Sequence, residues 1–177
     1  MLEGPAVIKA PEAGVWRIAR GDNPLAIPTD SDGTPYSGAN RFDALDMNYG
    51  VLYFGSDLET CLGEVLARFR PSVPMLALVE QEWLNSGFMA VGTVNADWRQ
   101  RRTAIHVKVP PDLQFLDVES PITHQFLRTE VAPGLVSLGV SDLDVSTVRG
   151  PDRRVTQMIS QWAYMASEGE NPIYAGI

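Results

Sequence analysis

Arginine is the residue type in this 177-residue sequence with the clearest chemical potential. Only Lys9 and Lys108 among its 14 basic residues are lysines. A guanidinium group presents a planar fork of donors that matches phosphate and carboxylate oxygens, so well-placed arginines could hold a phosphorylated ligand. A compositional bias of the genome would produce the same excess, and composition alone leaves both interpretations open.

Arg41, Tyr53 and Glu64 stand out on the best-defined stretch of the sequence, residues 40–70. At ~100° per residue, Glu64 lies about 130° from the apolar stripe of its predicted helix, on a flank rather than in the core. Its ordinary role there would be an exposed ion pair with Arg68. Tyr53 would ordinarily be a core aromatic residue, and Arg41 a surface cation. Spacing alone therefore does not separate these three from background.

A strand, a turn and a helix are predicted to position these side chains. The apolar and aromatic run between Gly50 and Gly55 predicts a buried strand. Ser56 and Glu59 have the spacing of a capping box, and Pro71 ends the helix that follows. The core-facing stripe of that helix comprises Leu58, Cys61, Leu62, Val65, Leu66 and Phe69.

Residues 15–19 alternate enough to predict a first strand, with Arg17 on the opposite side from Trp16 and Ile18. An inward arginine needs an anionic partner, whereas an outward one needs none, and the ordinary expectation is an outward side chain. Arg20 is a second candidate three residues later. Spacing does not choose between Arg17 and Arg20.

A long loop is predicted over residues 21–39, which are rich in Asp, Pro, Gly and Ser. A loop of this length is unusual in a compact domain unless it is a lid or a binding loop. Because it lies between Arg17 and Arg41, a substrate-covering flap is one interpretation. Plain surface disorder is the other.

The remainder of the chain predicts further helices and strands. The only dense basic cluster comprises Arg99, Arg101 and Arg102, for which a solvated turn is favoured over a phosphate or partner contact. Strands are predicted over 75–79, 113–118 and 172–177, a short strand or turn over 142–145, and helices over 121–131, broken at 133–134, and from 151–152 to 165.

Bulk properties exclude several classes of protein. The net charge of −8 and the pI near 4.7 argue against direct contact with nucleic acid. No membrane span or signal peptide is predicted, so a cytoplasmic protein is expected. Cys61, the lone cysteine, is expected to be a buried small hydrophobe. The length is that of one domain, residues 15–177, after a loosely packed lead-in over 1–14.

No metal site and no standard catalytic template is predicted. His106 and His124 are the only histidines and lie 18 residues apart, without Cys or carboxylate groups at ligand spacing. The sequence contains no G-x-G-x-x-G, no P-loop lysine and no G-x-S-x-G. Binding of a dinucleotide would therefore not use a Rossmann fingerprint.

Six short motifs resemble the RES domain family in order and spacing, over nearly the whole chain from about Val15 onward. Each motif is weak alone, and the six in this order are more specific. They are Trp16-Arg17-Ile18, Asn40-Arg41-Phe42-Asp43, Val51-Leu52-Tyr53-Phe54, Leu62-Gly63-Glu64-Val65, Asp142-Leu143-Asp144-Val145-Ser146 and Arg153-Arg154-Val155-Thr156-Gln157.

The resemblance implies an α+β fold, a single mixed α/β domain similar to the ADP-ribosyltransferase core. It also implies a bacterial toxin that cleaves the nicotinamide–ribose bond of NAD by phosphorolysis or hydrolysis, with inorganic phosphate as a candidate co-substrate and no metal. Glu64 would stabilise the positive charge that develops on the ribose. Arg17 and Arg41 would hold the diphosphate, and Tyr53 would stack on the nicotinamide or ribose.

The resemblance also implies a protein antitoxin as partner, and a homodimer is compatible with it. The family's Ser follows a Gly-Ile strand, here Gly176-Ile177, and is expected just beyond the last residue, so the domain is expected to be cut short at its C-terminus. Ser146 and Ser160 do not match that position. Two alternatives remain open: an ADP-ribosyltransferase that modifies a protein, and a catalytically silent binding module.

Overall fold

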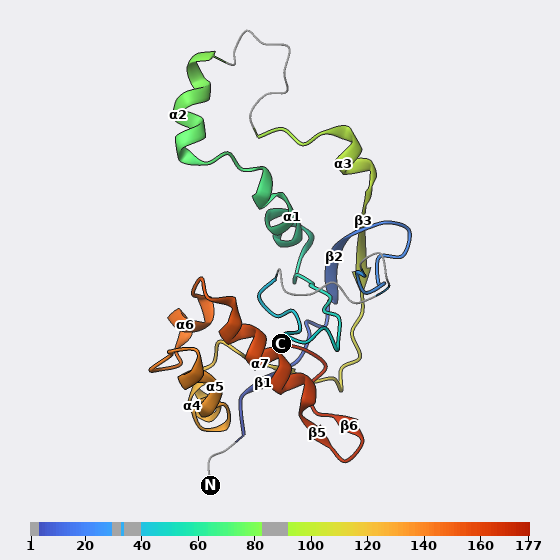
Figure 1. The fold of residues 1–177 in the computed structure, drawn as a ribbon. Helices are drawn as coiled ribbons and strands as arrows, with labels where there is room; N and C mark the ends of the chain where they lie inside the picture. The colour runs from blue at the N-terminus through green and yellow to red at the C-terminus, as the bar shows by residue number, and fades with distance from the viewer. Residues whose placement is uncertain (1–3, 30–32, 34–39, 83–91) are drawn as a thin grey trace. The chain divides into compact units, whose positions relative to one another are not determined.

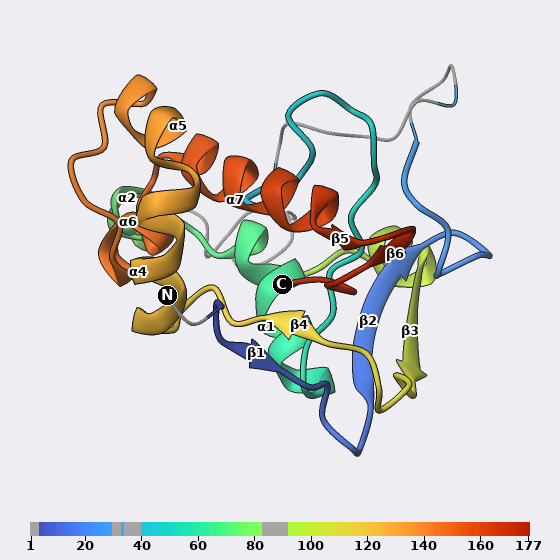
Figure 2. The same ribbon diagram turned by 90° about the horizontal axis from the view of Figure 1, so that it is seen from below.

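The protein has a mixed α+β fold, as the sequence predicts, in a computed structural model that describes residues 4–29, 33, 40–82 and 92–177. Within these residues the strands form three separate two-stranded antiparallel sheets, β1–β4, β2–β3 and β5–β6 (Figure 1 and Figure 2). The strands are β1 (Val7–Ile8), β2 (Val15–Arg20), β3 (Arg102–Val107), β4 (Phe115–Leu116), β5 (Ser167–Glu168) and β6 (Asn171–Pro172). The helices are α1 (Leu58–Leu66), α2 (Val73–Glu82), α3 (Ala96–Gln100), α4 (Pro121–Glu130), α5 (Ala132–Ser137), α6 (Val145–Arg149) and α7 (Arg153–Met165), with a 3-10 helix at Ala67–Phe69.

The chain forms two compact units, and each is described by itself. The first unit comprises Met1–Glu12, Ile27–Leu52 and Val109–Ile177, and the second comprises Ala13–Ala26 and Tyr53–Lys108. The longest described helix, α7, has 13 residues. Among the helices that the structure describes, none has the length and apolar character needed to cross a membrane.

In the second unit, β2 and β3 pair in antiparallel register from Val15 opposite Val107 to Arg20 opposite Arg102. The strand predicted at 15–19 is therefore confirmed. Gly14 precedes it with φ +90, and a Cβ there would lie only 2.6 Å from the Val107 carbonyl oxygen. Only glycine fits this tight approach of the two strands.

Helix α1 confirms the predicted helix, but its cap differs from the prediction. The N-cap residue is Asp57, whose carboxylate accepts a hydrogen bond from the Thr60 backbone N–H at 2.7 Å. The predicted capping box of Ser56 and Glu59 is wrong, because Ser56 donates its hydroxyl to Asp57 instead. An acidic N-cap also meets the positive end of the helix dipole, which favours Asp57 over its serine neighbour.

Two predicted strands on either side of α1 are wrong. The run before Gly55 pairs only at Gly55 itself, which exchanges two 2.8 Å backbone hydrogen bonds with Trp16, and Tyr53 and Phe54 are 40% and 41% exposed. Residues 75–79 lie inside α2 rather than in a strand. A five-residue apolar run fits either structure, and its Met, Leu and Ala residues are good helix formers.

In the first unit, α4, α5, α6 and α7 enclose one apolar core. Figure 2 shows α4 and α5 alongside α7, and residues from all four helices contribute buried side chains. The helices predicted at 121–131 and from 151–152 onward are confirmed as α4 and α7, and Asp152 caps α7. Fully buried core side chains include Leu116, Leu127, Leu143, Val155 and Ile159.

The other predictions for the first unit are confirmed only in part. The strand expected over 113–118 is reduced to β4, and that over 172–177 to Pro172 in β6 and a bridge between Gly176 and Phe115. Residues 142–144 form neither a strand nor an assigned turn: Asp144 caps α6 and Val145 begins it, while 133–134 lie in the first turn of α5. The lid predicted over 21–39 falls partly outside the described residues; residues 21–26 form turns and bends.

Candidate functional site

Arg17 points into the second unit rather than outward. Its side chain is buried, with 9% of the residue exposed, and its Nε donates to the Pro24 carbonyl at 2.9 Å. Its Nη1 donates to the Tyr53 carbonyl at 3.1 Å, and the guanidinium lies 5.9 Å from the centre of the Phe54 ring. The expectation of an outward Arg17 is therefore wrong, because backbone carbonyls supply the acceptors that an inward arginine needs.

The buried Arg17 guanidinium has no carboxylate partner among the described residues. Desolvation by burial lowers its pKa from the ordinary value. Two of its five N–H donors bond to carbonyls of described residues. Arg20, the alternative candidate, is exposed at the end of β2.

Glu64 lies on α1 with its side chain exposed, as a flank position predicts. The ordinary expectation was an ion pair with Arg68, and no such pair occurs in the part of the chain that the structure describes. Arg68 instead places its guanidinium over the Phe69 ring, 5.3 Å from the ring centre. The Glu64 carboxylate is thus accessible and is not neutralised by its helix neighbour.

Tyr53 lies in the same unit as Arg17 and Glu64. The exposed Tyr53 does not fill the core, contrary to its ordinary expectation. Its backbone carbonyl accepts from Arg17, so the buried guanidinium fixes the main chain from which the tyrosine ring projects. Three of the four predicted site residues, Arg17, Tyr53 and Glu64, therefore belong to the second unit, and Arg17 and Tyr53 are joined directly.

Arg41 belongs to the first unit, where its guanidinium binds the C-terminal end of α6. Nη1 donates to the carbonyls of Val148 and Gly150 at 2.6 and 3.0 Å, and Nη2 donates to that of Arg149 at 3.3 Å. The last carbonyls of a helix lack partners within the helix and carry partial negative charge, which a guanidinium satisfies well. Arg41 is therefore a fixed, half-buried cation rather than a free surface one.

One polar face of α7 holds the segment that carries Arg41. Gln157, Thr156 and Ser160 donate to the successive backbone carbonyls of residues 40–42, and all three side chains are buried. Buried carbonyls need such partners. In the sequence, Thr156 and Gln157 stand out only as part of a motif; the signal of their role is three polar residues within the core-facing side of an amphipathic helix.

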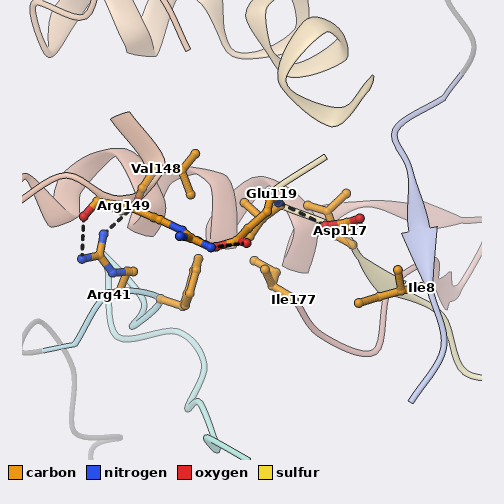
Figure 3. Close-up of a pocket in the computed structure, with 10 residues that line it drawn as sticks. Ile8, Arg41, Asp117, Glu119, Val148, Arg149 and Ile177 are labelled. Carbon is orange, nitrogen blue, oxygen red and sulfur yellow. Dashed lines mark hydrogen bonds and ion pairs between the residues drawn. The ribbon is translucent and has the colours of Figure 1, made fainter. Parts of the chain in front are cut away.

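A pocket of about 520 Å³ opens beside Arg41 in the first unit (Figure 3). This volume lies in the usual range for small-molecule pockets, ~300–1,000 Å³. Its lining combines apolar side chains with charged side chains of both signs. The lining residues are Ile8, Arg41, Phe42, Leu116, Asp117, Val118, Glu119, Val148, Arg149 and Ile177.

Glu119 and Arg149 form a bidentate ion pair across this pocket, with N–O distances of 2.8 and 2.7 Å. The hydrogen bonds from Arg149 lower the pKa of Glu119, and the same bonds raise the pKa of Arg149. Each group therefore stays charged and partnered. These two residues are 30 positions apart, and no sequence pattern linked them.

The two histidines have structural contacts. His106 stacks on Trp16 with ring centres 4.6 Å apart, and the buried His124 has its Nε2 2.8 Å from the Val118 carbonyl oxygen. Within residues 4–29, 40–82 and 92–177, no group of three or more His, Cys, Asp or Glu side chains could hold a metal ion.

Comparison with known families matches residues 14–176 to the RES domain. The chain belongs to the RES domain family. No curated protein matches the chain, and no solved structure matches it either. RES domains are known as NAD-degrading toxins of toxin–antitoxin systems. Membership therefore implies an NAD-degrading enzyme, with NAD as its substrate and an antitoxin as its partner.

Proposed function

We propose that this RES domain breaks the nicotinamide–ribose bond of NAD, with Glu64 as the catalytic carboxylate. The choice of NAD as substrate rests on the family match over residues 14–176. The exposed Glu64 carboxylate, which forms no ion pair with Arg68, supports the choice of residue. The reaction requires an unneutralised carboxylate that can approach the ribose.

The chemistry follows from the charge that develops as the bond breaks. Nicotinamide leaves with the bonding electron pair, and positive charge accumulates on C1′ and the ring oxygen of the ribose. A carboxylate beside the ribose stabilises that charge more strongly in the transition state than in the ground state. In phosphorolysis a phosphate oxygen then bonds to C1′; in hydrolysis water does so and releases a proton.

The other proposed site residues bind the substrate. Arg17, in the second unit, supplies a guanidinium group for the diphosphate, and Arg41, in the first unit, is a second candidate for that role. Tyr53 supplies an exposed ring for the nicotinamide or ribose, and Arg17 holds its main chain in place. The same proposal includes inorganic phosphate as the acceptor of the ADP-ribosyl group and a protein antitoxin as the inhibitor of the enzyme.

The test is NAD consumption by the purified protein, with and without inorganic phosphate. The key variant is Glu64→Gln, and Glu59→Gln is the matched control, since Glu59 is exposed on the same helix and loses the same charge. Loss of transition-state stabilisation by one such group lowers kcat about 10²- to 10³-fold. We expect that loss for Glu64→Gln and near wild-type activity for Glu59→Gln.

The products decide between the alternatives. NAD loss that requires phosphate and yields a phosphorylated ADP-ribose identifies a phosphorylase, whereas phosphate-independent loss that yields ADP-ribose identifies a hydrolase. Transfer of the ADP-ribosyl group to a protein identifies the transferase. No NAD loss by the wild-type protein, and none by a protein extended past Ile177, would favour a binding module.

A further inference from the structure

Three arginines gather at one end of the β2–β3 ladder in the second unit. Arg20 is the last residue of β2, Arg102 is the first residue of β3, and the two lie directly opposite each other in the register. Arg68 comes from the 3-10 helix that continues α1. We call Arg20, Arg68 and Arg102 the arginine cluster.

Two aromatic rings hold two of these guanidinium groups in place. The Arg102 guanidinium lies 4.9 Å from the centre of the Trp98 ring, and that of Arg68 lies 5.3 Å from the centre of the Phe69 ring. The two rings contact each other edge to face, with centres 5.3 Å apart. The cations are therefore preorganised by cation–π contacts on a shared aromatic base.

This arrangement is unfavourable without an anion. Like charges directly opposite each other on an antiparallel ladder are destabilising. Desolvation, followed by the charges of Arg20 and Arg68, lowers the pKa of Arg102, yet a guanidinium stays protonated at neutral pH.

The arginine cluster has no counter-ion in the described structure. None of its members forms an ion pair there, although the neighbouring Arg101 pairs with Asp97 at 2.8 Å. The indole N–H of Trp98, beneath Arg102, is enclosed and has no acceptor among the described residues. The three guanidinium groups and the Trp98 N–H are therefore hydrogen-bond donors that lack acidic partners among the described residues.

The charge distribution of the whole chain sharpens this contrast. The second unit carries eight Arg and Lys against seven Asp and Glu, whereas the first carries six against fifteen. The second unit is thus close to neutral at +1 in a chain of net charge −8. Acidic side chains are plentiful in the sequence, yet none pairs with the three cations within the described residues.

We propose that the arginine cluster is a binding site for a phosphate group. Guanidinium forks match phosphate oxygens, and fixed forks lose little entropy on binding. Arg68 lies four residues after Glu64, about one helical turn, so one member of the cluster comes from the turn that follows the proposed catalytic carboxylate. The phosphate comes either from the diphosphate of NAD or from free inorganic phosphate, and that choice of ligand rests on the proposed function.

The decisive variant is Arg20→Gln, because the Arg20 side chain has no ion pair or ring contact with any residue that the structure describes. Binding of inorganic phosphate, of NAD and of nicotinamide riboside, which lacks the diphosphate, is measured by calorimetry in a Glu64→Gln background without turnover. Loss of one charge-assisted hydrogen bond weakens binding about tenfold. We expect that weakening for Arg20→Gln and again for Arg68→Gln.

Arg101→Gln is the matched control, since it removes the same charge next to Arg102 but from an arginine already paired with Asp97. It should leave phosphate and NAD affinity within about twofold of the parent, as expected for an exposed charge.

The unfolding temperature of Arg20→Gln without ligand should equal or exceed that of the parent, because a like-charge repulsion is removed. A merely structural arginine would lower it.

Binding measurements with the three ligands distinguish the two sources of phosphate. Weaker NAD binding with unchanged nicotinamide riboside binding assigns the cluster to the diphosphate of NAD. Weaker phosphate binding with unchanged NAD binding assigns it to the free anion. If Arg20→Gln and Arg68→Gln bind both ligands as the parent does, the proposal is overturned, whether or not the wild-type protein degrades NAD.

Discussion

At the scale of single residues, the two arginines predicted to grip a phosphate are both tied to main-chain carbonyls. Arg17 binds those of Pro24 and Tyr53, and Arg41 binds the end of α6. A sequence shows which residues are arginine but not which carbonyls fold back toward them, since those contacts span up to 109 positions. The residue types of the candidate site could be predicted, whereas the acceptors that fix them could not.

Thr156 provides a direct test of how the Arg41 segment is held. Its fully buried hydroxyl bonds the carbonyls of Arg41 and Arg153. Thr156→Val has nearly the same shape but leaves the Arg41 carbonyl without this donor, and should lower the free energy of unfolding by about 1–3 kcal/mol. Thr156→Ser keeps the hydroxyl and should lose less. Urea unfolding of the two variants measures the difference, and equal stabilities would show that this hydrogen bond does not hold the segment.

At the scale of elements, helices were predicted better than strands, and the reason is physical. Helices α4 and α7 are long, follow a helical period and begin at Ser120 and Asp152, whose side chains are good caps. The apolar runs at 51–54 and 75–79 are four and five residues long, too short for periodicity to separate strand, helix and extended loop. Contacts with the rest of the protein determined the conformation of both runs, and those contacts cannot be predicted from a single sequence.

The cap of α1 is a second example, because the residue spacing predicts a capping box at Ser56 whereas Asp57 is the N-cap in the structure. The Thr60 N–H, followed by the hydroxyls of Thr60 and Ser56, lowers the pKa of Asp57. A folded-state pKa below the unfolded value of about 3.9 means that the carboxylate stabilises the fold above that pH and loses its effect as the pH falls through the folded value. Asp57→Ala should therefore lower the unfolding temperature at pH 7, and by much less near pH 2. Ser56→Ala should change it little at either pH, and a larger loss for Ser56→Ala than for Asp57→Ala would restore the predicted capping box.

At the scale of the whole molecule, each of the two units is built from separate segments of one chain. Three separate segments build the first unit and two build the second, so the chain passes from one to the other at residues 12–13, 26–27, 52–53 and 108–109. Such interleaving was not visible in the sequence, where composition and length predicted one domain with a short lead-in. A unit made of distant segments closes long loops before its contacts form, which makes it a poor candidate for folding alone.

Interleaving predicts a single cooperative unfolding transition for the protein. Calorimetric and van't Hoff enthalpies should agree, as for a two-state domain. Thr156→Val weakens a hydrogen bond of the first unit and Asp57→Ala a cap of the second, yet each should shift the same transition by its full amount. Independent units would give two transitions, with each variant moving only one of them. The two variants report on cooperativity even if two transitions overlap. If the units unfolded independently, the midpoints measured by circular dichroism, which helices dominate, and by tryptophan fluorescence would differ in one variant and agree in the other.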